Sequence, residues 1–318
     1  PLYDWVIESA ETSNRPKQVE FARLEIDYSI TSKRKLLSLV EEGYVSGWDD
    51  PRLQTLKGMR RRGYPPEAIK NFCELIGVTK KQAVIDFSTL ENCVREELDR
   101  KTPRMMAVLD PIKVIIDNYP ENSSELLKVP NHPKDSTFGY RKIPMTKEIY
   151  IDRSDFMEEP PKKFHRLSPG EKVRLRYAFV ITCQKVIKDE AGIVQELHCS
   201  FDSSTYNGKN PEGGKVKGII HWVSATQNTP IEVRLFDRPF NVANPNGEED
   251  FRQFLNPKSL EVKQNAIAEI SLKSTKKSQF QFERTGYFTI DKEDSNDEKL
   301  VYNRTATLRD SWLKEQKK

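Results

Sequence analysis

A hydroxyl side chain followed by three cations could form a phosphate site near the start of the chain. The segment Thr31-Ser32-Lys33-Arg34-Lys35 immediately precedes an apolar pattern of helical spacing. The first turn of a helix has free backbone N–H groups and the positive end of the helix dipole, and both attract phosphate. The lysine side chains add full positive charges. Many solvated helices begin in the same way, so the chemistry alone leaves a phosphate site and an exposed helix start both open.

A second concentration of positive charge lies in the middle of the sequence. Residues 162–188 contain eight Lys or Arg residues and the single acid Glu171, a local charge of +7, whereas the whole chain has a formal charge of +4. A local excess of this size is typical of a surface that binds a polyanion. An ordinary solvated basic face is the alternative that composition by itself allows.

Cysteine and histidine show no pattern of metal ligands or disulfides. The four cysteines are scattered without CxxC spacing, and the four histidines form no ligand set. We therefore expect no structural metal and no disulfide scaffold, and we expect the cysteines to be small buried apolar groups. His221 lies in an apolar strand pattern, which favours a packing role over catalysis.

The composition also bears on location. No apolar run approaches the roughly 20 residues of a membrane span, and the first residues show no basic start followed by an apolar stretch. We therefore expect a cytoplasmic protein without a membrane partner.

The elements that must position these residues change in type at about residue 103. Up to that point apolar residues recur at helical spacing. Helices are predicted to begin after Ser32, at Pro65-Pro66 and at Ser88, where Ser88 and Glu91 match a capping box, and Gly77 ends the second helix. These three helices predict a compact helical unit.

Beyond residue 103 the apolar spacing becomes mostly period two. Residues 173–181 alternate, which predicts one strand with Arg174 and Arg176 on a shared exposed face. Residues 189–192 supply a turn, and 193–201 read as the returning strand. Further strands are expected at 148–152, 216–224, 231–237 and 279–291. Many short strands with Pro, Gly and Asn between them favour one or two antiparallel barrels.

Several strings resemble class I aminoacyl-tRNA synthetases of the glutaminyl subgroup. The segment 21–36 is similar to the second signature of that subgroup, which is of KMSKS type. Other similar strings lie at residues 47–52, 58–64, 107–111, 130–133, 218–225 and 281–284. Their order and spacing match the family from end to end, so the resemblance covers essentially the whole chain.

This resemblance implies an α+β multidomain fold. Residues 1–30 would be the C-terminal end of a Rossmann-type catalytic domain, and 31–103 the KMSKS-like loop with a helical connector. Residues 104–318 would be an anticodon-binding region of two antiparallel β-barrels, the distal barrel at roughly 120–225 and the proximal one built from the flanking segments. No HIGH-type motif occurs in the sequence. We therefore expect the C-terminal part of a longer enzyme, inactive by itself.

The resemblance also implies an activity and partners. The complete glutaminyl-tRNA synthetase would use ATP and Mg²⁺ to form glutaminyl-adenylate, and would then attach glutamine to tRNA-Gln as a monomer. A glutamyl-tRNA synthetase of eukaryotic or archaeal type is an alternative, since it shares this architecture, and the two anticodons differ at the third base. A non-catalytic tRNA-binding protein is a second alternative.

Five positions correspond to the nucleotide site of the family. Ser32 and Lys33 match the signature loop that contacts the ATP phosphates, and Lys33 would be the catalytic residue that stabilises charge during adenylate formation. Arg23 and Leu24 match a pair that helps to hold the nucleotide. Thr31 departs from the usual Met or Leu, which puts the contact of that residue in doubt.

The tRNA-binding positions implied by the resemblance fall into two groups. Along the inside of the L-shaped tRNA we expect Thr79, Lys80, Lys81 and Gln82. At the anticodon we expect Arg104, Gln281 and Arg284 at the middle base, Arg166 at the third base, and Arg174 and Arg176 at the first base. Arginine suits this role because its planar fork can bond a base edge or phosphate in bidentate fashion and can stack on splayed bases.

Overall fold

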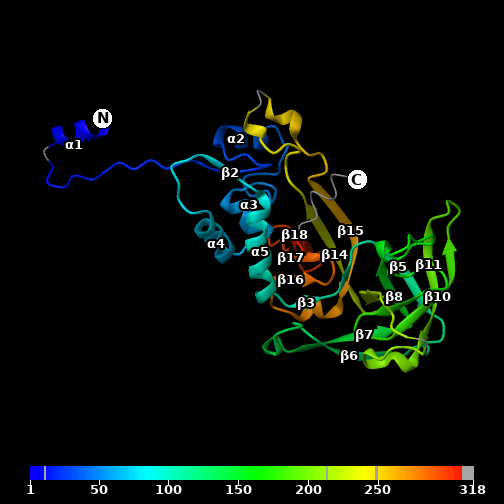
Figure 1. Ribbon diagram of the computed structural model, residues 1–318. Helices are drawn as coiled ribbons and strands as arrows, with labels where there is room; N and C mark the ends of the chain where they lie inside the picture. Colours follow the sequence, from blue (N-terminus) through cyan, green and yellow to red (C-terminus); the bar gives the residue numbers. More distant parts are fainter. Residues whose placement is uncertain (11, 213, 248–249, 310–318) are drawn as a thin grey trace.

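The computed structural model describes residues 1–10, 12–212, 214–247 and 250–309. Two seven-stranded sheets make up most of it, and the helices that follow residue 30 lie beside one of them (Figure 1). The mixed α+β class and the two barrel-like sheets that the sequence predicts are confirmed. No helix within these residues combines the length and apolarity needed to cross a bilayer.

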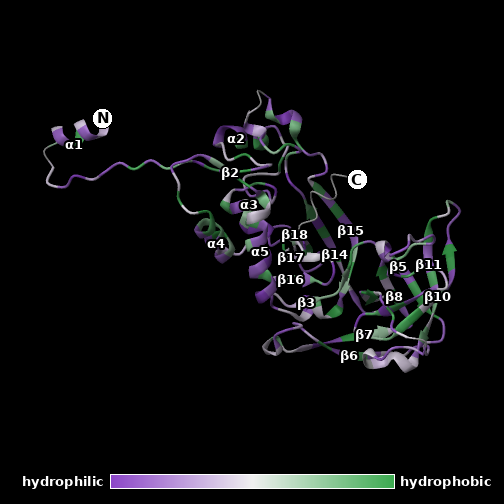
Figure 2. Cartoon of the chain, viewed as in Figure 1, coloured by the Kyte–Doolittle hydropathy of each residue, from purple (hydrophilic) through white to green (hydrophobic). Residues whose placement is uncertain are grey.

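Five α-helices precede residue 103 in the described part of the chain. They are α1 (Leu2–Ser9), α2 (Lys33–Glu41), α3 (Leu56–Arg62), α4 (Pro66–Ile76) and α5 (Phe87–Lys101). The predicted starts of α2 and α4 are confirmed, because Ser32 is the N-cap position of α2 and α4 begins at Pro66. Helix α1 has no buried residue and lies at the far end of an extended, largely hydrophilic segment (Figures 1 and 2).

The capping box predicted for α5 is wrong. The N-cap is Asp86, whose carboxylate accepts a hydrogen bond from the Ser88 backbone N–H at 2.7 Å. Asp27 accepts the preceding amide, Phe87 N–H, also at 2.7 Å. A carboxylate two residues earlier therefore takes the capping role that Ser88 was expected to fill.

Two short parallel strands join the segment before α2 to the segment before α5. Strand β1 (Leu24–Ile26) pairs with β2 (Ala83–Ile85), with Leu24 opposite Ala83 and Ile26 opposite Ile85. Residues 59 positions apart in the sequence are thereby held side by side.

The first large sheet, here called the proximal sheet, packs against the helices. Its strand order is β3-β16-β17-β18-β14-β15-β4. The strands are β3 (Arg104–Met105), β4 (Ala107–Val108), β14 (Asn228–Phe236), β15 (Leu260–Glu269), β16 (Gln279–Phe282), β17 (Gly286–Ile290) and β18 (Val301–Thr307). Tyr287 and Ala306 share a buried cluster with Phe72, Leu90 and Val94 of the helices.

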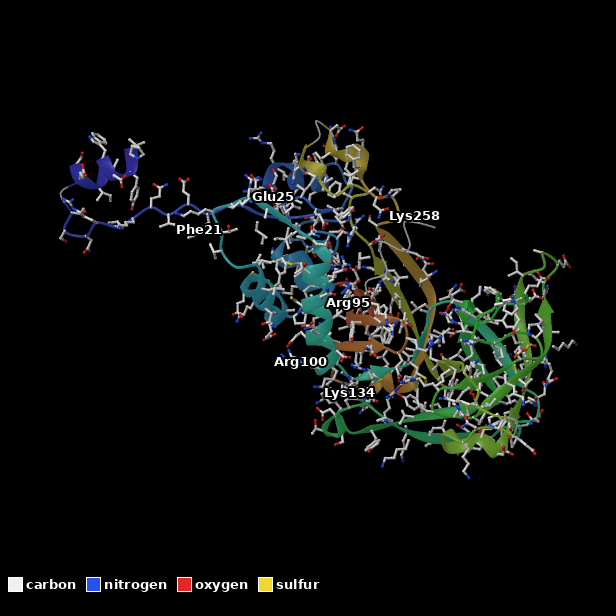
Figure 3. All side chains as sticks on the ribbon, in the orientation of Figure 1. Phe21, Glu25, Arg95, Arg100, Lys134 and Lys258 are labelled. Carbon is white, nitrogen blue, oxygen red and sulfur yellow. The ribbon has the colours of Figure 1, made fainter. Side chains whose placement is uncertain are left out.

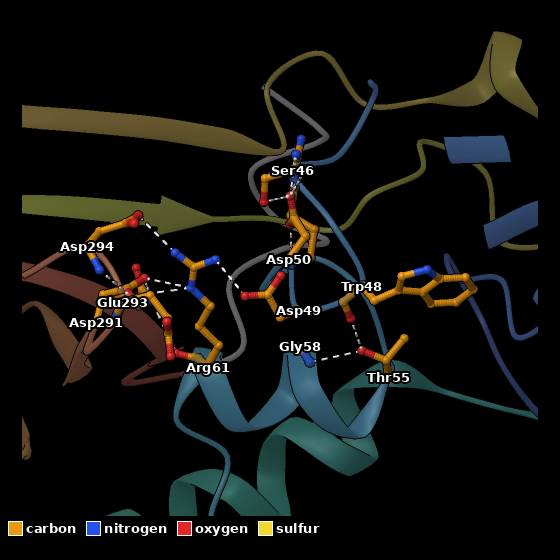
Figure 4. A network of polar contacts seen from close by, with 12 residues as sticks. Ser46, Trp48, Asp49, Asp50, Thr55, Gly58, Arg61, Asp291, Glu293 and Asp294 are labelled. Carbon is orange, nitrogen blue, oxygen red and sulfur yellow. Dashed lines mark hydrogen bonds and ion pairs between the residues drawn. The ribbon is translucent and has the colours of Figure 1, made fainter. Parts of the chain in front are cut away.

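Polar contacts reinforce the seam between the helices and the proximal sheet (Figure 4). Arg61, in the last turn of α3, lies within 3.0 Å of Asp49, Asp291 and Asp294. Asp291 is fully buried and also accepts a hydrogen bond from Asn303 at 2.8 Å. Because carboxylates from two distant segments share one guanidinium, the helical unit is fixed to the sheet at this point.

The second large sheet, here called the distal sheet, has the order β12-β9-β10-β11-β5-β8-β13. The strands are β5 (Pro111–Ile116), β8 (Glu148–Asp152), β9 (Lys172–Leu175), β10 (Val180–Lys188), β11 (Val194–Asp202), β12 (Ile219–Ile220) and β13 (Trp222–Ser224). A separate hairpin of β6 (Ser124–Pro130) and β7 (Tyr140–Thr146) lies beside it. The core of the distal sheet is enclosed by largely hydrophobic strands (Figure 2). Each large sheet is mainly antiparallel with two parallel pairs.

Three predicted strands are wrong in extent. Residues 173–181 form β9 and β10 with a turn between them, in which Tyr177 has a φ of 65°. Residues 279–291 contain the hairpin β16–β17, and 216–224 contain two short strands. Period-two alternation continues through a tight turn, so the pattern alone does not reveal the reversal. The predicted hairpin around 189–192 and the strand at 148–152 are confirmed.

The expectation for the cysteines is confirmed for three of the four. Cys93, Cys183 and Cys199 are buried, whereas Cys73 is exposed on α4. The prediction for Cys73 is wrong because its position turns away from the helical core that Phe72 fills.

Candidate nucleic-acid interface

The KMSKS-like loop lies at the start of α2, and its lysines differ in their environment. Thr31 and Lys33 are exposed, and Ser32 is half-buried without a side-chain capping hydrogen bond. Lys35 is held by protein, since its Nζ donates to the Asn246 carbonyl at 3.1 Å. Within the described residues Lys33 has no ion-pair partner, so its charge is available to a ligand.

The parallel pair β1–β2 brings two groups of predicted site residues together. Arg23 and Leu24 stand at the start of β1, and Thr79–Gln82 lead into β2, with Ala22 N–H donating to Thr79 O at 2.9 Å. The Arg23 side chain is 71% exposed and 3.9 Å from Glu25. Gln82 Nε2 donates to the same Glu25 at 3.2 Å. This patch lies where the chain passes from the extended segment to the helices, near Phe21 and Glu25 in Figure 3.

Arg166 and Arg284 meet at one buried carboxylate. Asp155 is 1% exposed, and its Oδ1 lies 2.7 Å from Arg284 Nη2 and 3.3 Å from Arg166 Nε. Arg166 also donates to the Ser154 carbonyl at 2.7 Å. Two arginines that are 118 positions apart in the sequence are thus joined by a residue that sequence reasoning missed.

His221 lies next to this carboxylate and contacts Arg284. It is 3% exposed, and its Nδ1 lies 2.9 Å from Arg284 Nη1. Because arginine can only donate, Nδ1 must be the unprotonated nitrogen of the ring. Burial lowers the pKa of His221, in keeping with a neutral imidazole. His221 therefore helps to orient Arg284.

Arg104 and Gln281 lie opposite each other where β3 pairs with β16. Arg104 is 4% exposed, forms an ion pair with Asp99 and donates to the Thr102 carbonyl at 2.9 Å. Gln281 is half-buried and lines a surface hollow with Arg95, Arg100 and Tyr287. Arg95 and Arg100 are seen on α5 in Figure 3. In this conformation Gln281 is the more accessible of the pair.

The prediction that Arg174 and Arg176 share an exposed face is wrong. Arg174, in β9, donates to the carbonyls of Thr205 and Lys209. Arg176 lies in the β9–β10 turn, where it forms an ion pair with Glu283 and stacks over Tyr177 at 4.9 Å. The turn rotates the second arginine away from the first, so the two guanidinium groups serve different contacts.

Glu283 is the centre of a buried charge network between the sheets. It accepts a hydrogen bond from Tyr177 Oη at 2.8 Å and lies 3.5 Å from Arg141 Nη2, in addition to its ion pair with Arg176. Burial, with the Glu283 charge, raises the pKa of Tyr177 to about 12. Arg284, the residue after Glu283, binds Asp155. Two successive residues of the β16–β17 turn therefore form ionic contacts with the distal side of the molecule.

Two hollows meet at Arg166 and Phe164. One, the basic hollow, has a volume of about 890 Å³. Six cations and two acids line it: Lys162, Lys163, Arg166, Lys172, Lys215, Lys217, Glu171 and Glu212. The other, the inter-sheet cleft, has a volume of about 760 Å³ and contains Asp155, His221, Lys263 and Arg284. A positive hollow with an aromatic ring at its edge can hold a backbone phosphate and stack a splayed base.

Sequence reasoning found most of these cations but none of their counter-ions. Glu283 lies within a string used for the resemblance, so its position was visible but its role was not. Asp155 has no local signal, because its partners come from the loop before β9 and from the β16–β17 turn. Within the described residues no group of three or more His, Cys, Asp or Glu side chains could hold a metal ion.

Three family descriptions match the chain in order. Residues 1–100 match the catalytic domain of the class I tRNA synthetases (E and Q). Residues 102–202 and 219–291 match anti-codon binding domains of the same class.

Curated relatives agree with these matches. A glutamine–tRNA ligase of Pseudomonas syringae pv. tomato is 52% identical over 316 residues, covering 98% of this chain and 55% of the relative. Those of Ectopseudomonas mendocina and Psychromonas ingrahamii are 53% and 49% identical, again over 98% of this chain and over 57% and 56% of their own lengths. The chain thus spans about half the length of the curated relatives it matches. With three domain descriptions matched in order, the chain belongs to the class I tRNA synthetases of the E and Q type.

Proposed function

We propose that this chain is the anticodon-reading part of a glutamine–tRNA ligase. The observation that carries the proposal is the junction of the basic hollow with the inter-sheet cleft at Phe164 and Arg166. Positive charge, an aromatic face and guanidinium groups are the set of groups that single-stranded RNA loops require. The names of the relatives favour glutamine over glutamate as the amino acid.

The complete enzyme would join glutamine to tRNA-Gln in the cytoplasm, by way of glutaminyl-adenylate and at the expense of ATP. Lys33 would neutralise charge on the ATP phosphates, with Ser32 at the helix start and with Arg23 and Leu24 beside the nucleotide. Thr31 is exposed and would lie at the edge of this site. Mg²⁺ would accompany the ATP phosphates.

The tRNA would extend from β2 to the distal sheet as it binds one monomer. Exposure of Thr79, Lys80, Lys81 and Gln82 supports a contact with the tRNA backbone. Arg166 and Arg284 would read the third and middle bases, with Gln281 beside the latter. Arg104, Arg174 and Arg176 are bound to protein groups in the free chain, and they would need to exchange those partners to reach a base.

Binding of the chain to three tRNAs tests this proposal. The probes are tRNA-Gln, tRNA-Glu and a tRNA-Gln whose third anticodon base is changed, each titrated over a salt series. We expect tighter binding of tRNA-Gln by about tenfold, with affinity falling steeply as salt rises. Equal binding of all three tRNAs at every salt concentration would show a basic RNA surface without base recognition, and would contradict the proposal.

A further inference from the structure

Asp155 is a buried carboxylate with two guanidinium partners from different parts of the fold. It ends a short 3-10 turn after β8, and its backbone carbonyl accepts the Leu167 N–H at 3.0 Å. Arg284 binds both of its oxygens, and Arg166 lies 3.3 Å from one of them. Asp155 and Arg166 belong to the distal side, whereas Arg284 lies in the β16–β17 turn of the proximal sheet.

The burial of Asp155 makes the two arginines depend on each other. A carboxylate that is 1% exposed needs compensating charge, because an unpaired buried charge is strongly unfavourable. The loss of one guanidinium leaves the other as the sole counter-ion and draws it inward. The spacing of Arg166 and Arg284 is therefore set by Asp155.

Backbone geometry restricts Arg284 further. Its φ is +67°, a left-handed conformation that is unfavourable for a non-glycine residue. The preceding Glu283 is held by Tyr177 Oη at 2.8 Å. Surrounding contacts thus hold a strained turn in place, and the side chain of Arg284 has little freedom to find another partner.

Each of the two arginines keeps one donor that is not used by the described part of the protein. Among the described residues Arg166 Nη2 and Arg284 Nε have no hydrogen-bond partner, and the Arg166 side chain is 42% exposed. Both residues line the inter-sheet cleft. A ligand in the cleft would meet two guanidinium groups at a distance fixed from behind.

We propose that Asp155 is a positioning residue that couples the reading of the middle and third anticodon bases. This inference rests on the proposed function, in which Arg284 and Arg166 read those two bases. A correct base at one position holds its arginine against Asp155 and so fixes the neighbouring arginine. The two bases are then recognised as a pair, and a change at one position weakens recognition at the other.

The test compares the unchanged chain with the Asp155→Asn variant, which keeps the size of the side chain and removes its charge. Four tRNAs are needed: tRNA-Gln, one changed at the middle base, one changed at the third base, and one changed at both. We expect Asp155→Asn to lower discrimination at both positions by about tenfold while binding of the doubly changed tRNA stays within about twofold. A matched control is Asp110→Asn, because Asp110 lines the same cleft but pairs with Arg153.

Two results would overturn the inference. Asp155→Asn could weaken all four tRNAs equally, or it could leave both discriminations unchanged. If the unchanged chain discriminates and Asp155→Asn does too, only this inference fails. If the unchanged chain does not discriminate, the proposed function fails as well.

A second measurement does not require Asp155→Asn to fold. Arg166→Gln and Arg284→Gln are made singly and together, and discrimination is measured for each. Coupling through Asp155 predicts that the fold-loss of discrimination in the double variant exceeds the fold-loss in the worse single variant by no more than about twofold. Losses that multiply independently would contradict a shared counter-ion.

Discussion

At the residue scale, arginines that look alike in the sequence have different environments. Arg62 is buried and points to three backbone carbonyls, at 3.4 to 3.5 Å from those of Thr305, Pro51 and Phe236. Arg166, by contrast, lines the basic hollow and keeps one donor without a hydrogen-bond partner among the described residues. A guanidinium group is always charged, so its role is decided by which acceptors surround it.

The acid side of the stability profile is expected to depend on Asp291. Burial opposes its ionisation, but hydrogen bonds from Asn303 and Arg61 outweigh burial and hold the pKa of Asp291 below its usual range. A lowered folded-state pKa gives stability that is present above the unfolded value, about 4, and is lost as pH falls through the folded value. Urea unfolding between about pH 6 and pH 2 should show this loss.

Asp291→Asn should reduce the free energy of unfolding at pH 7 by about 3 kcal/mol, because it leaves Arg61 with one buried partner fewer. The variant should also lose less stability on acidification than the unchanged chain. Asp297→Asn is the control, since that side chain is exposed and makes no ion pair among the described residues. A parallel loss in the variant and the unchanged chain would assign acid sensitivity to other groups.

At the element scale, helix ends and glycine turns fix the helical unit against the proximal sheet. The first two backbone amides of helix α5 donate hydrogen bonds to the carboxylates of Asp27 and Asp86. Helix α3 ends at Gly63, whose φ is +93°. Each feature sets the path of the chain at a helix end. Each can be tested by comparing a substitution there with the same substitution at a control residue.

Asp86→Ala should destabilise the protein more than Ser88→Ala. The Asp86 carboxylate accepts the Ser88 N–H at 2.7 Å, and loss of an N-cap side chain typically costs about 0.5–2 kcal/mol. Ser88 is not the N-cap in this fold, so its replacement should cost less. Chemical denaturation of both variants measures the difference. A larger loss of unfolding free energy in Ser88→Ala would instead support the capping box that the sequence predicted.

Gly63→Ala should cost considerably more stability than Gly43→Ala. Both glycines have positive φ, at +93° and +76°. A Cβ at Gly63 would lie 2.6 Å from the Cβ of Thr289, whereas nothing lies within 4 Å at Gly43. We expect losses of about 3 kcal/mol and about 1 kcal/mol in thermal or urea unfolding. Equal losses would mean that only the backbone conformation matters.

At the scale of the whole molecule, the two sheets are joined by buried charge. Glu283, in the β16–β17 turn of the proximal sheet, contacts three side chains that lie on the distal side: Arg141, Arg176 and Tyr177. Arg141 also forms an ion pair with Glu269 of β15. Buried pairs of this kind are costly to break because they leave one charge uncompensated. The network therefore opposes separation of the sheets and preserves the cleft between them.

Glu283→Gln should weaken the joint between the sheets. We expect the free energy of unfolding to fall by about 3 kcal/mol. Amide hydrogen exchange should become faster in the β9–β10 turn, where Arg176 loses its ionic partner. Glu261→Gln is the control, because Glu261 is an exposed residue of β15 paired only with Lys263 among the described residues. Unchanged exchange in the turn would contradict the role given to Glu283.

Local patterns were sufficient for much of the fold. The starts of α2 and α4, the hairpin of β10 and β11 and strand β8 follow from spacing, Pro and Gly, which act over a few residues. The basic character of residues 162–188 was equally visible, because charge is a property of composition. The resemblance to the family also needed only the order of the strings.

Tertiary structure alone decided which protein groups these cations bind. Alternation in residues 173–181 hid the turn at Tyr177, so Arg174 and Arg176 were assigned to one face that does not exist. The meeting of Arg166 with Arg284 at Asp155 depends on two sheets closing against each other. Sequence patterns report local backbone preference, whereas the pairing of Asp155 with Arg284 is decided by packing between segments 129 residues apart.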